Sequence, residues 1–154
     1  MSTLIDDIIA NFKQQYILYR DMERESRQQL EGLQGSGYVE VGLILERRRS
    51  ILLELDQLGR DNRNMQQEVI KELGIKEFNL SQLKACISTE KWSTLAKLID
   101  QLGQLLQIIT AIDGQSQQLM AKLQASGGAK KTGQIKHSQA LQAYQQTLRQ
   151  NKES

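Results

Sequence analysis

The chain has 154 residues, which suits one domain with a buried core, and its net charge of +2 is too small to predict a nucleic-acid binder. It has no proline and only 5% aromatic residues, and it is rich in Leu, Gln, Lys, Arg and Glu, so helix is expected nearly throughout. The single Cys86 cannot form an internal disulfide, which fits a reducing compartment. The first ten residues lack the basic start of a signal peptide, and no apolar run approaches the ~18 to 20 residues needed to span a bilayer. We therefore expect a cytoplasmic protein without membrane insertion.

Two long helices are expected in the first half of the chain. The first begins near Ser2, and its apolar residues step by 4, 3, 4 and 3, as in a helix packed lengthwise on another: Ile5, Ile9, Phe12, Tyr16 and Tyr19. A glycine cluster at 32–37 predicts a break where the chain reverses. The second helix is expected from about Tyr38 to Leu73, with Asn62 on its apolar stripe as a polar residue that can fix register. Gly74 is well placed to end it, with Ile75 folding back onto it.

The second half is expected to hold a short helix and a third long one. Asn79 or Ser81 can cap the short helix, which would run through Ile87 and bury Cys86 as a small apolar side chain. Ser88 can cap the most apolar helix of the chain, from about 90 to 125. Its apolar face is broader than a two-helix seam and implies contact with more than one neighbour: Trp92, Leu95, Leu98, Ile99, Leu102, Leu105, Leu106, Ile109, Ile112, Leu119 and Leu123.

The remaining segment has a different character. Residues 127–136 are rich in Gly and Lys and are expected to form a flexible linker between a helical bundle at 1–126 and an amphipathic segment at 137–154. In that segment His137, Leu141, Tyr144 and Leu148 recur at steps of 4, 3 and 4, but so short a helix is marginal in water unless it lies on its own bundle or on a partner. From Lys122 onward six basic residues and one acid give +5, which leaves −3 for residues 1–121. The expected fold class is all-α, an antiparallel bundle of three long helices with a flexible C-terminal amphipathic helix.

The sequence offers few groups for chemistry, and we expect no catalytic, cofactor-binding or metal-binding site. The only histidine and the only cysteine are far apart, without zinc-ligand spacing, and the glycines at 35–37 lack the strand and the lysine of a phosphate loop. The consecutive arginines at 47–49 point in three directions around a helix and cannot form a one-sided stripe along a duplex. Several carboxylates lie at helical intervals from basic residues and are expected to form exposed pairs with them: Glu23, Glu25, Asp56 and Asp61. Neither an enzyme nor a nucleic-acid binder is expected.

Protein binding is the class that these observations favour, and two features support it. One is the end of the broad apolar face, at Leu119 and Leu123, and the other is the tail stripe of Leu141, Tyr144 and Leu148. Simple core packing is the alternative for the first feature. For the second, the alternatives are a tail that docks on its own bundle and a tail that is disordered.

The layout resembles the FlgN family of flagellar type III export chaperones over residues 11–148. The similarity consists of a long first helix, the glycine break at 32–37, a second helix with Glu46-Arg47 and the Ile-Leu-Leu-Glu-Leu run at 51–55, the Leu73-Gly74 connector, a leucine-bearing segment at 78–83, a helix over 92–123 and a tail with a tyrosine. There are two departures from the family pattern. Asp113 and Ser116 stand where family members usually carry paired asparagines, and Tyr144 is followed by Gln145 instead of glycine.

The resemblance implies a cytoplasmic chaperone that keeps hook-filament junction (hook-associated) proteins unpolymerised and delivers them to the export apparatus. It also implies that the C-terminal part captures the substrate, by helix-in-groove packing. The expected partner-binding residues are Leu119, Leu123, Leu141, Tyr144 and Leu148. A structural or adaptor coiled-coil protein that acts by homo-oligomerisation, for example as a homodimer, is the alternative.

Overall fold

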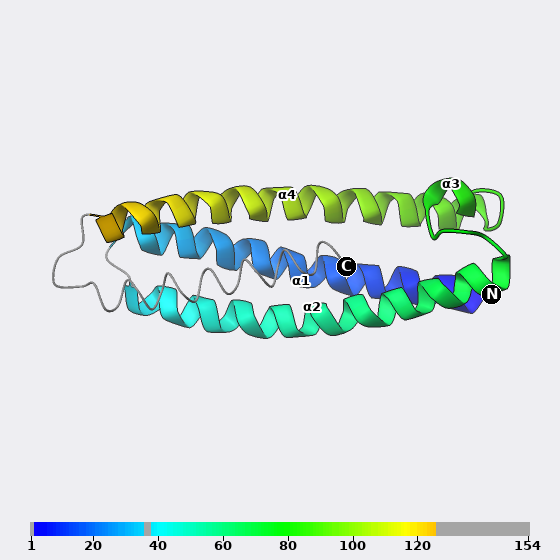
Figure 1. Cartoon of the computed structure of the whole chain (residues 1–154), viewed down its shortest axis with the longest axis horizontal. Coiled ribbons are helices and arrows are strands. Elements are labelled where there is room, and N and C mark those ends of the chain that lie inside the picture. Colours follow the sequence, from blue (N-terminus) through cyan, green and yellow to red (C-terminus); the bar gives the residue numbers. More distant parts are fainter. Residues whose placement is uncertain (1, 36–37, 126–154) are drawn as a thin grey trace.

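The structure is a computed structural model that describes residues 2–35 and 38–125. All regular secondary structure in these residues is helical. The helices are α1 (Ser2–Gln34), α2 (Tyr38–Leu73), α3 (Leu80–Leu83) and α4 (Thr89–Ala125). In Figure 1 the three long helices lie side by side along the whole molecule, with α1 and α4 running in one direction and α2 in the other. The expected all-α bundle of three long helices is thus confirmed. The expected linker and C-terminal amphipathic segment lie outside the described residues.

Helix α1 is the element that the other two long helices share. It packs along both α2 and α4, whereas no Cα atom of α2 lies within 8 Å of a Cα atom of α4. Since neighbouring packed helices lie about 8 to 10 Å apart, α2 and α4 are not packed directly on each other. The broad face of α4 meets α1 and the short α3. The bundle therefore has one side on which two helices flank α1 without closing over it.

The helix ends follow the local signals in the sequence. Gly74 has a φ of +68°, the left-handed conformation that ends helices and favours glycine, and its N–H donates to the Ile70 carbonyl at 3.0 Å. The Asn79 side chain accepts a hydrogen bond from the Gln82 N–H at 2.8 Å and caps α3. The Ser88 hydroxyl oxygen accepts from the Lys91 N–H at 3.2 Å at the start of α4. The end of α2 at Leu73 and the caps of α3 and α4 at Asn79 and Ser88 confirm the predictions for these positions.

The apolar core is divided into two clusters. The turn cluster lies towards the α1–α2 turn and consists of Leu18, Met22, Leu33, Val41, Leu52, Leu55, Leu105, Ile109 and Met120. The corner cluster lies towards α3 and consists of Ile5, Ile8, Ile9, Val69, Leu83, Leu95 and Leu98. Ile75 packs against the corner cluster, as its place after the C-cap glycine predicts. Burial of side chains of this size stabilises a fold by about 1.5 to 3 kcal/mol each, so the two clusters hold the helices together.

The expectation for Cys86 is wrong. Helix α3 ends at Leu83, so Cys86 lies beyond it, and its side chain is exposed. Its Sγ lies 3.5 Å from the Gln82 carbonyl oxygen. The apolar contacts at this corner are made instead by Leu83 and Ile87, which belong to or pack against the corner cluster. The predicted helix through Ile87 is therefore shorter than expected, and its turn beyond Leu83 points the thiol outward.

Helix α4 is also more apolar than the sequence argument allowed. By length and composition it could cross a membrane, contrary to the expectation that no stretch approaches this. In the bundle, Leu95, Leu98, Leu102, Leu105 and Ile109 of this helix are buried, whereas Ile99 and Ile108 are exposed. The core helix of a bundle satisfies the same criterion of length and composition. The finding is therefore weak evidence for a membrane span.

Candidate protein-binding site and the buried charge layer

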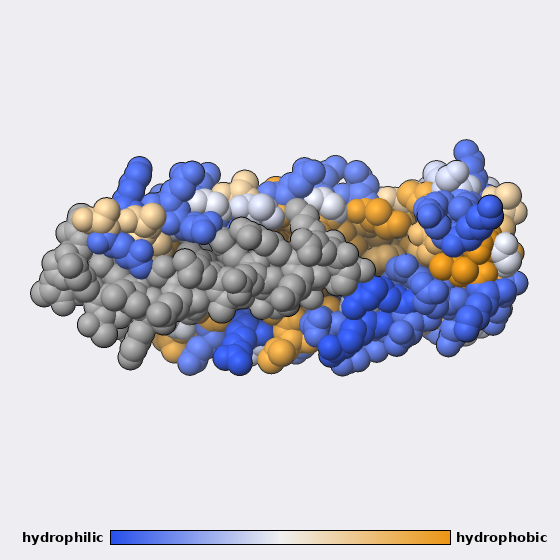
Figure 2. Space-filling model, in the orientation of Figure 1, coloured by the Kyte–Doolittle hydropathy of each residue, from blue (hydrophilic) through white to orange (hydrophobic). Residues whose placement is uncertain are grey.

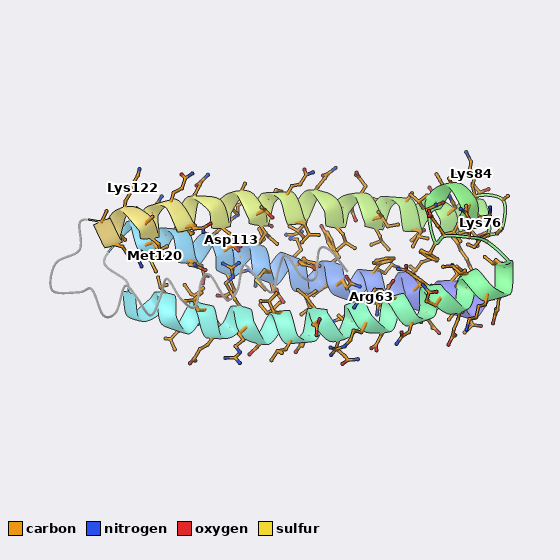
Figure 3. All side chains as sticks on the ribbon, in the orientation of Figure 1. Arg63, Lys76, Lys84, Asp113, Met120 and Lys122 are labelled. Carbon is orange, nitrogen blue, oxygen red and sulfur yellow. The ribbon has the colours of Figure 1, made fainter. Side chains whose placement is uncertain are left out.

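A buried ion pair joins α2 to α4. The Arg48 guanidinium donates to both carboxylate oxygens of Asp113, with Nη1 2.8 Å from Oδ1 and Nη2 2.6 Å from Oδ2. The Arg48 side chain has no exposed surface, and that of Asp113 is 3% exposed. Asp113 points from α4 into the bundle (Figure 3). Because the backbones of α2 and α4 stay apart, this long side chain is a direct connection between them.

Helix α1 contributes two further side chains around this pair, and we call Arg48, Asp113, Gln29 and Met22 together the charge layer. Arg48 Nη1 also donates to Oε1 of Gln29, and Arg48 Nε lies 3.3 Å from Sδ of Met22. Two further polar side chains of the core, Ser26 and Ser116, have buried hydroxyls without a hydrogen-bond partner in the part of the chain that the structure describes. Both serines lie one helical turn from a member of the layer, since Ser26 precedes Gln29 by three residues and Ser116 follows Asp113 by three.

The charge layer favours one alignment of the helices over others. A charge taken out of water is stable only when it is paired and hydrogen-bonded, and the bidentate geometry of arginine with a carboxylate is the strongest such arrangement. If α4 slipped by one turn along the bundle, Arg48 would face Ile109 or Ser116 in place of Asp113, and both charges would lose their partner. We infer that the layer contributes more to register than to net stability.

A second polar layer separates the two core clusters. The Asn62 side-chain amide donates to Oδ1 of Asn11 at 2.8 Å, and the Asn11 amide donates to the Leu58 carbonyl at 3.0 Å. Gln15 and Gln66 extend the network from the neighbouring turns. Asn62 is 2% exposed. The prediction that Asn62 lies on the packed stripe is confirmed, and its partner is an asparagine of α1.

Outside the core, the charged side chains form exposed or half-exposed pairs. Within single helices, Arg27 pairs with Glu23 at 2.8 Å and Arg60 with Asp56 at 2.9 Å, both four residues apart, as predicted. Between helices, Arg47 Nε lies 3.0 Å from Oε1 of Glu25. Such pairs contribute about 0.2 to 1 kcal/mol each. Arg47 and Arg48 thus illustrate two environments in adjacent residues, one half-exposed and one fully buried.

The candidate partner-binding residues fall into two groups. Leu119 and Leu123 are partly buried and pack against the turn cluster, so part of each side chain belongs to the core. Leu141, Tyr144 and Leu148 lie outside the described residues, as does His137. Of the five residues, the structure therefore describes only Leu119 and Leu123. Among the residues it describes, no group of three His, Cys, Asp or Glu side chains could hold a metal ion.

Sequence reasoning missed the charge layer. The signal was present, because Arg48 follows Ile44 and precedes Leu52 by four residues each, and therefore lies on the apolar stripe of α2. Asp113 follows Ile109 by four residues on the stripe of α4. Asp113 and Ser116, which together form the first of the two departures from the family pattern, are both buried. They are therefore positions inside the bundle, where a change alters packing between helices.

No protein family, curated protein or solved structure matches the chain. The resemblance to flagellar export chaperones therefore stays a prediction from the residues that carry it.

Proposed function

We propose that the chain is a cytoplasmic export chaperone of the flagellar type, which binds hook-filament junction proteins through a helical surface and keeps them unpolymerised. The observation that carries the proposal is the order and length of the helices. The bundle of α1, α2 and α4, with the short α3 between the last two, agrees with the layout on which the resemblance rests. An elongated bundle of this kind offers long apolar stripes on which an amphipathic partner helix can pack.

The tail stripe of Leu141, Tyr144 and Leu148 is the preferred capture surface within this proposal. Leu119 and Leu123 at the end of α4 are the second part, and because they also pack on the core, substitutions there change stability as well as binding. The tail residues are therefore the better positions for a test. Binding through an apolar anchor typically loses more than about 1.4 kcal/mol, or tenfold in affinity, when the anchor is truncated.

Titration calorimetry of the full chain against C-terminal fragments of hook-associated junction proteins tests the proposal. The variant Leu141→Ala/Tyr144→Ala should bind at least about tenfold more weakly than the unmodified chain. The matched control, Gln139→Ala/Gln146→Ala, changes two residues on the opposite side of the same helical repeat and should bind normally.

Two other results of this titration would contradict parts of the proposal. Affinity of the double tail variant within about twofold of the unmodified chain would exclude the tail stripe as the capture surface. No binding by the unmodified chain would contradict the chaperone proposal. If light scattering then showed a tight homodimer, the alternative of a structural coiled-coil protein would be favoured.

A further inference from the structure

The outer side of α4 differs from that of α2 in its lack of charge. Between Gln101 and Ala121 the only charged residue of α4 is Asp113, and its carboxylate is bound to Arg48 inside the bundle. The stretch of equal length at 46–66 of α2 holds nine charged residues. In Figure 2 hydrophilic residues along α4 alternate with pale residues of intermediate hydropathy. Depletion of charge is the compositional signal of the centre of a protein interface, so this side of α4 is a candidate contact surface.

Six residues on this side follow one another at steps of 4, 3, 4, 3 and 4, the spacing of a helix packed lengthwise on another helix. We call them the outer seam: Gly103, Gln107, Thr110, Gly114, Gln117 and Ala121. Gly114 is half-buried, and the other five are exposed. Leu105 and Ile109 mark the side of α4 that packs in the core. Gln107 lies two residues from each of them, or about 200° of rotation, so the outer seam points away from the core.

The outer seam is self-complementary. From either end the order is a small residue, a glutamine, two small residues, a glutamine and a small residue. If two copies of α4 ran antiparallel with residue 112 at the centre of the contact, Gln107 of each copy would lie opposite Gln117 of the other. Small residues would then face small residues, since 103 would lie opposite 121 and 110 opposite 114. In a twofold-symmetric dimer every contact occurs twice, so a stripe of this kind matches a second copy of the same chain.

The polar groups of the outer seam are compatible with such a contact. The Thr110 hydroxyl donates to the Leu106 carbonyl within the helix at 2.8 Å, so Thr110 needs no polar partner outside. A glutamine side chain has both a donor and an acceptor, so Gln107 and Gln117 of two copies can hydrogen-bond to each other.

Two glycines of the outer seam have no packing role among the described residues. A Cβ atom added at Gly103 or Gly114 would meet nothing within 4 Å. Glycine is less favourable than alanine in a helix interior, so in the single chain these glycines are destabilising. A second helix on this side would use them, because the distance between packed helices is shorter where the side chains at the contact are small.

Charged residues border the outer seam at both ends and are complementary in the antiparallel arrangement. Asp100 lies three residues before Gly103, and Lys122 lies next to Ala121. The Asp100 carboxylate accepts a hydrogen bond from the Gln104 amide at 3.0 Å. With residue 112 at the centre, Asp100 of one copy would lie level with residue 124 of the other, about 3 Å along the axis from Lys122. Opposite charges would therefore meet at both ends of the contact, whereas a parallel arrangement would bring like charges together.

We propose that the outer seam is the interface of a weak antiparallel homodimer, in which α4 of one copy packs on α4 of a second copy with Gln107 opposite Gln117. A contact between one pair of helices is smaller than the standard interface of about 1,600 Å², so a dissociation constant in the micromolar range is expected. The proposal depends on exposed residues of α4 and not on the proposed function. Its test uses the chain without any other protein, so a failure of the chaperone proposal leaves the result unaffected.

Sedimentation velocity of the full chain at about 1 to 500 μM tests the dimer. The mass should rise from 17.5 kDa towards twice this value as the concentration increases. In Gln107→Glu/Gln117→Glu, carboxylates face carboxylates at both symmetric contacts, and the dissociation constant should increase at least about tenfold. In Gln107→Glu/Gln117→Lys, opposite charges meet only if the helices are antiparallel, and the dissociation constant should stay within about threefold of that of the unmodified chain.

A matched control separates this contact from the effect of net charge. Gln14→Glu/Gln28→Glu adds the same two charges at exposed positions of α1 and should dimerise like the unmodified chain. Circular dichroism should show the same helix content in all the variants, since Gln, Glu and Lys have similar helix propensities.

Four results would overturn the inference. The first is an unmodified chain that stays monomeric at the highest concentration. The second is a dissociation constant of Gln107→Glu/Gln117→Glu within about twofold of that of the unmodified chain. The third is equal weakening in Gln107→Glu/Gln117→Lys, because the helices would then not be antiparallel in this register. The fourth is equal weakening in the α1 control, because net charge would then explain the effect.

Discussion

Breaking the Arg48–Asp113 pair should destabilise the bundle far more than breaking an exposed pair. Asp113→Ala removes the carboxylate that neutralises the buried Arg48 guanidinium, while the contacts of Arg48 with Gln29 and Met22 remain. Removal of one partner from a buried ion pair typically costs about 3 to 5 kcal/mol. For a chain of this length that lowers the melting temperature by roughly 6 to 20 °C, at about 2 to 4 °C per kcal/mol.

The adjacent arginine provides the control. Arg47→Ala removes the half-exposed pair with Glu25 and should cost no more than about 1 kcal/mol. The double variant Arg48→Met/Asp113→Leu replaces both charges by apolar side chains and should recover at least half of the loss, with Gln29 left without its partner as the residual cost. Urea unfolding followed by circular dichroism measures all three. If Asp113→Ala cost the same as Arg47→Ala, the charge layer would not be buried and balanced as described.

Three further predictions concern local features. Gly74→Ala should lower the free energy of unfolding by about 1 kcal/mol because the φ of Gly74 is +68°. Gly103→Ala lies in a helix interior with nothing within 4 Å of the added carbon, and it should raise the free energy of unfolding by about 0.5 to 1 kcal/mol. Equal effects of the two substitutions in urea unfolding would contradict this. Burial raises the pKa of Tyr19 above its ordinary 10.0, so the unfolded chain loses the phenolic proton at lower pH than the folded chain. The free energy of unfolding should therefore fall as pH rises through 10, and it should fall less in Tyr19→Phe. The same dependence of stability on pH in the two chains would exclude the effect. Cys86 is exposed and should react with a thiol reagent in the native chain as fast as in urea, and strong protection would place it in the core.

Local signals in the sequence predict the helix boundaries well, because each is decided by a few adjacent residues. The second helix was expected from Tyr38 to Leu73 and has those ends. Gly74 and Asn79 act through their own backbone and side chain, within three residues, and nothing distant overrides them. Cys86 was misassigned because its position depends on where a four-residue helix ends, which tertiary contacts at the corner determine.

The charge layer could not be predicted in the same way, because its partners are 65 residues apart. An arginine between two others is normally solvated, and a single sequence does not reveal that Arg48 alone of the three is buried. The position of both residues on apolar stripes is the usable signal. A charged residue on a helix stripe therefore predicts a charged partner on a neighbouring helix, which here would have pointed to Asp113 as the only acid between residues 101 and 125.

The most direct test of the proposed function is whether the chain keeps a junction protein unpolymerised. Light scattering of a purified hook-associated junction protein, followed over time with and without an equimolar amount of the full chain, measures this. The chaperone proposal predicts that scattering stays at the level of a one-to-one complex when the chain is present and rises when it is absent. The same rise in both samples would contradict it.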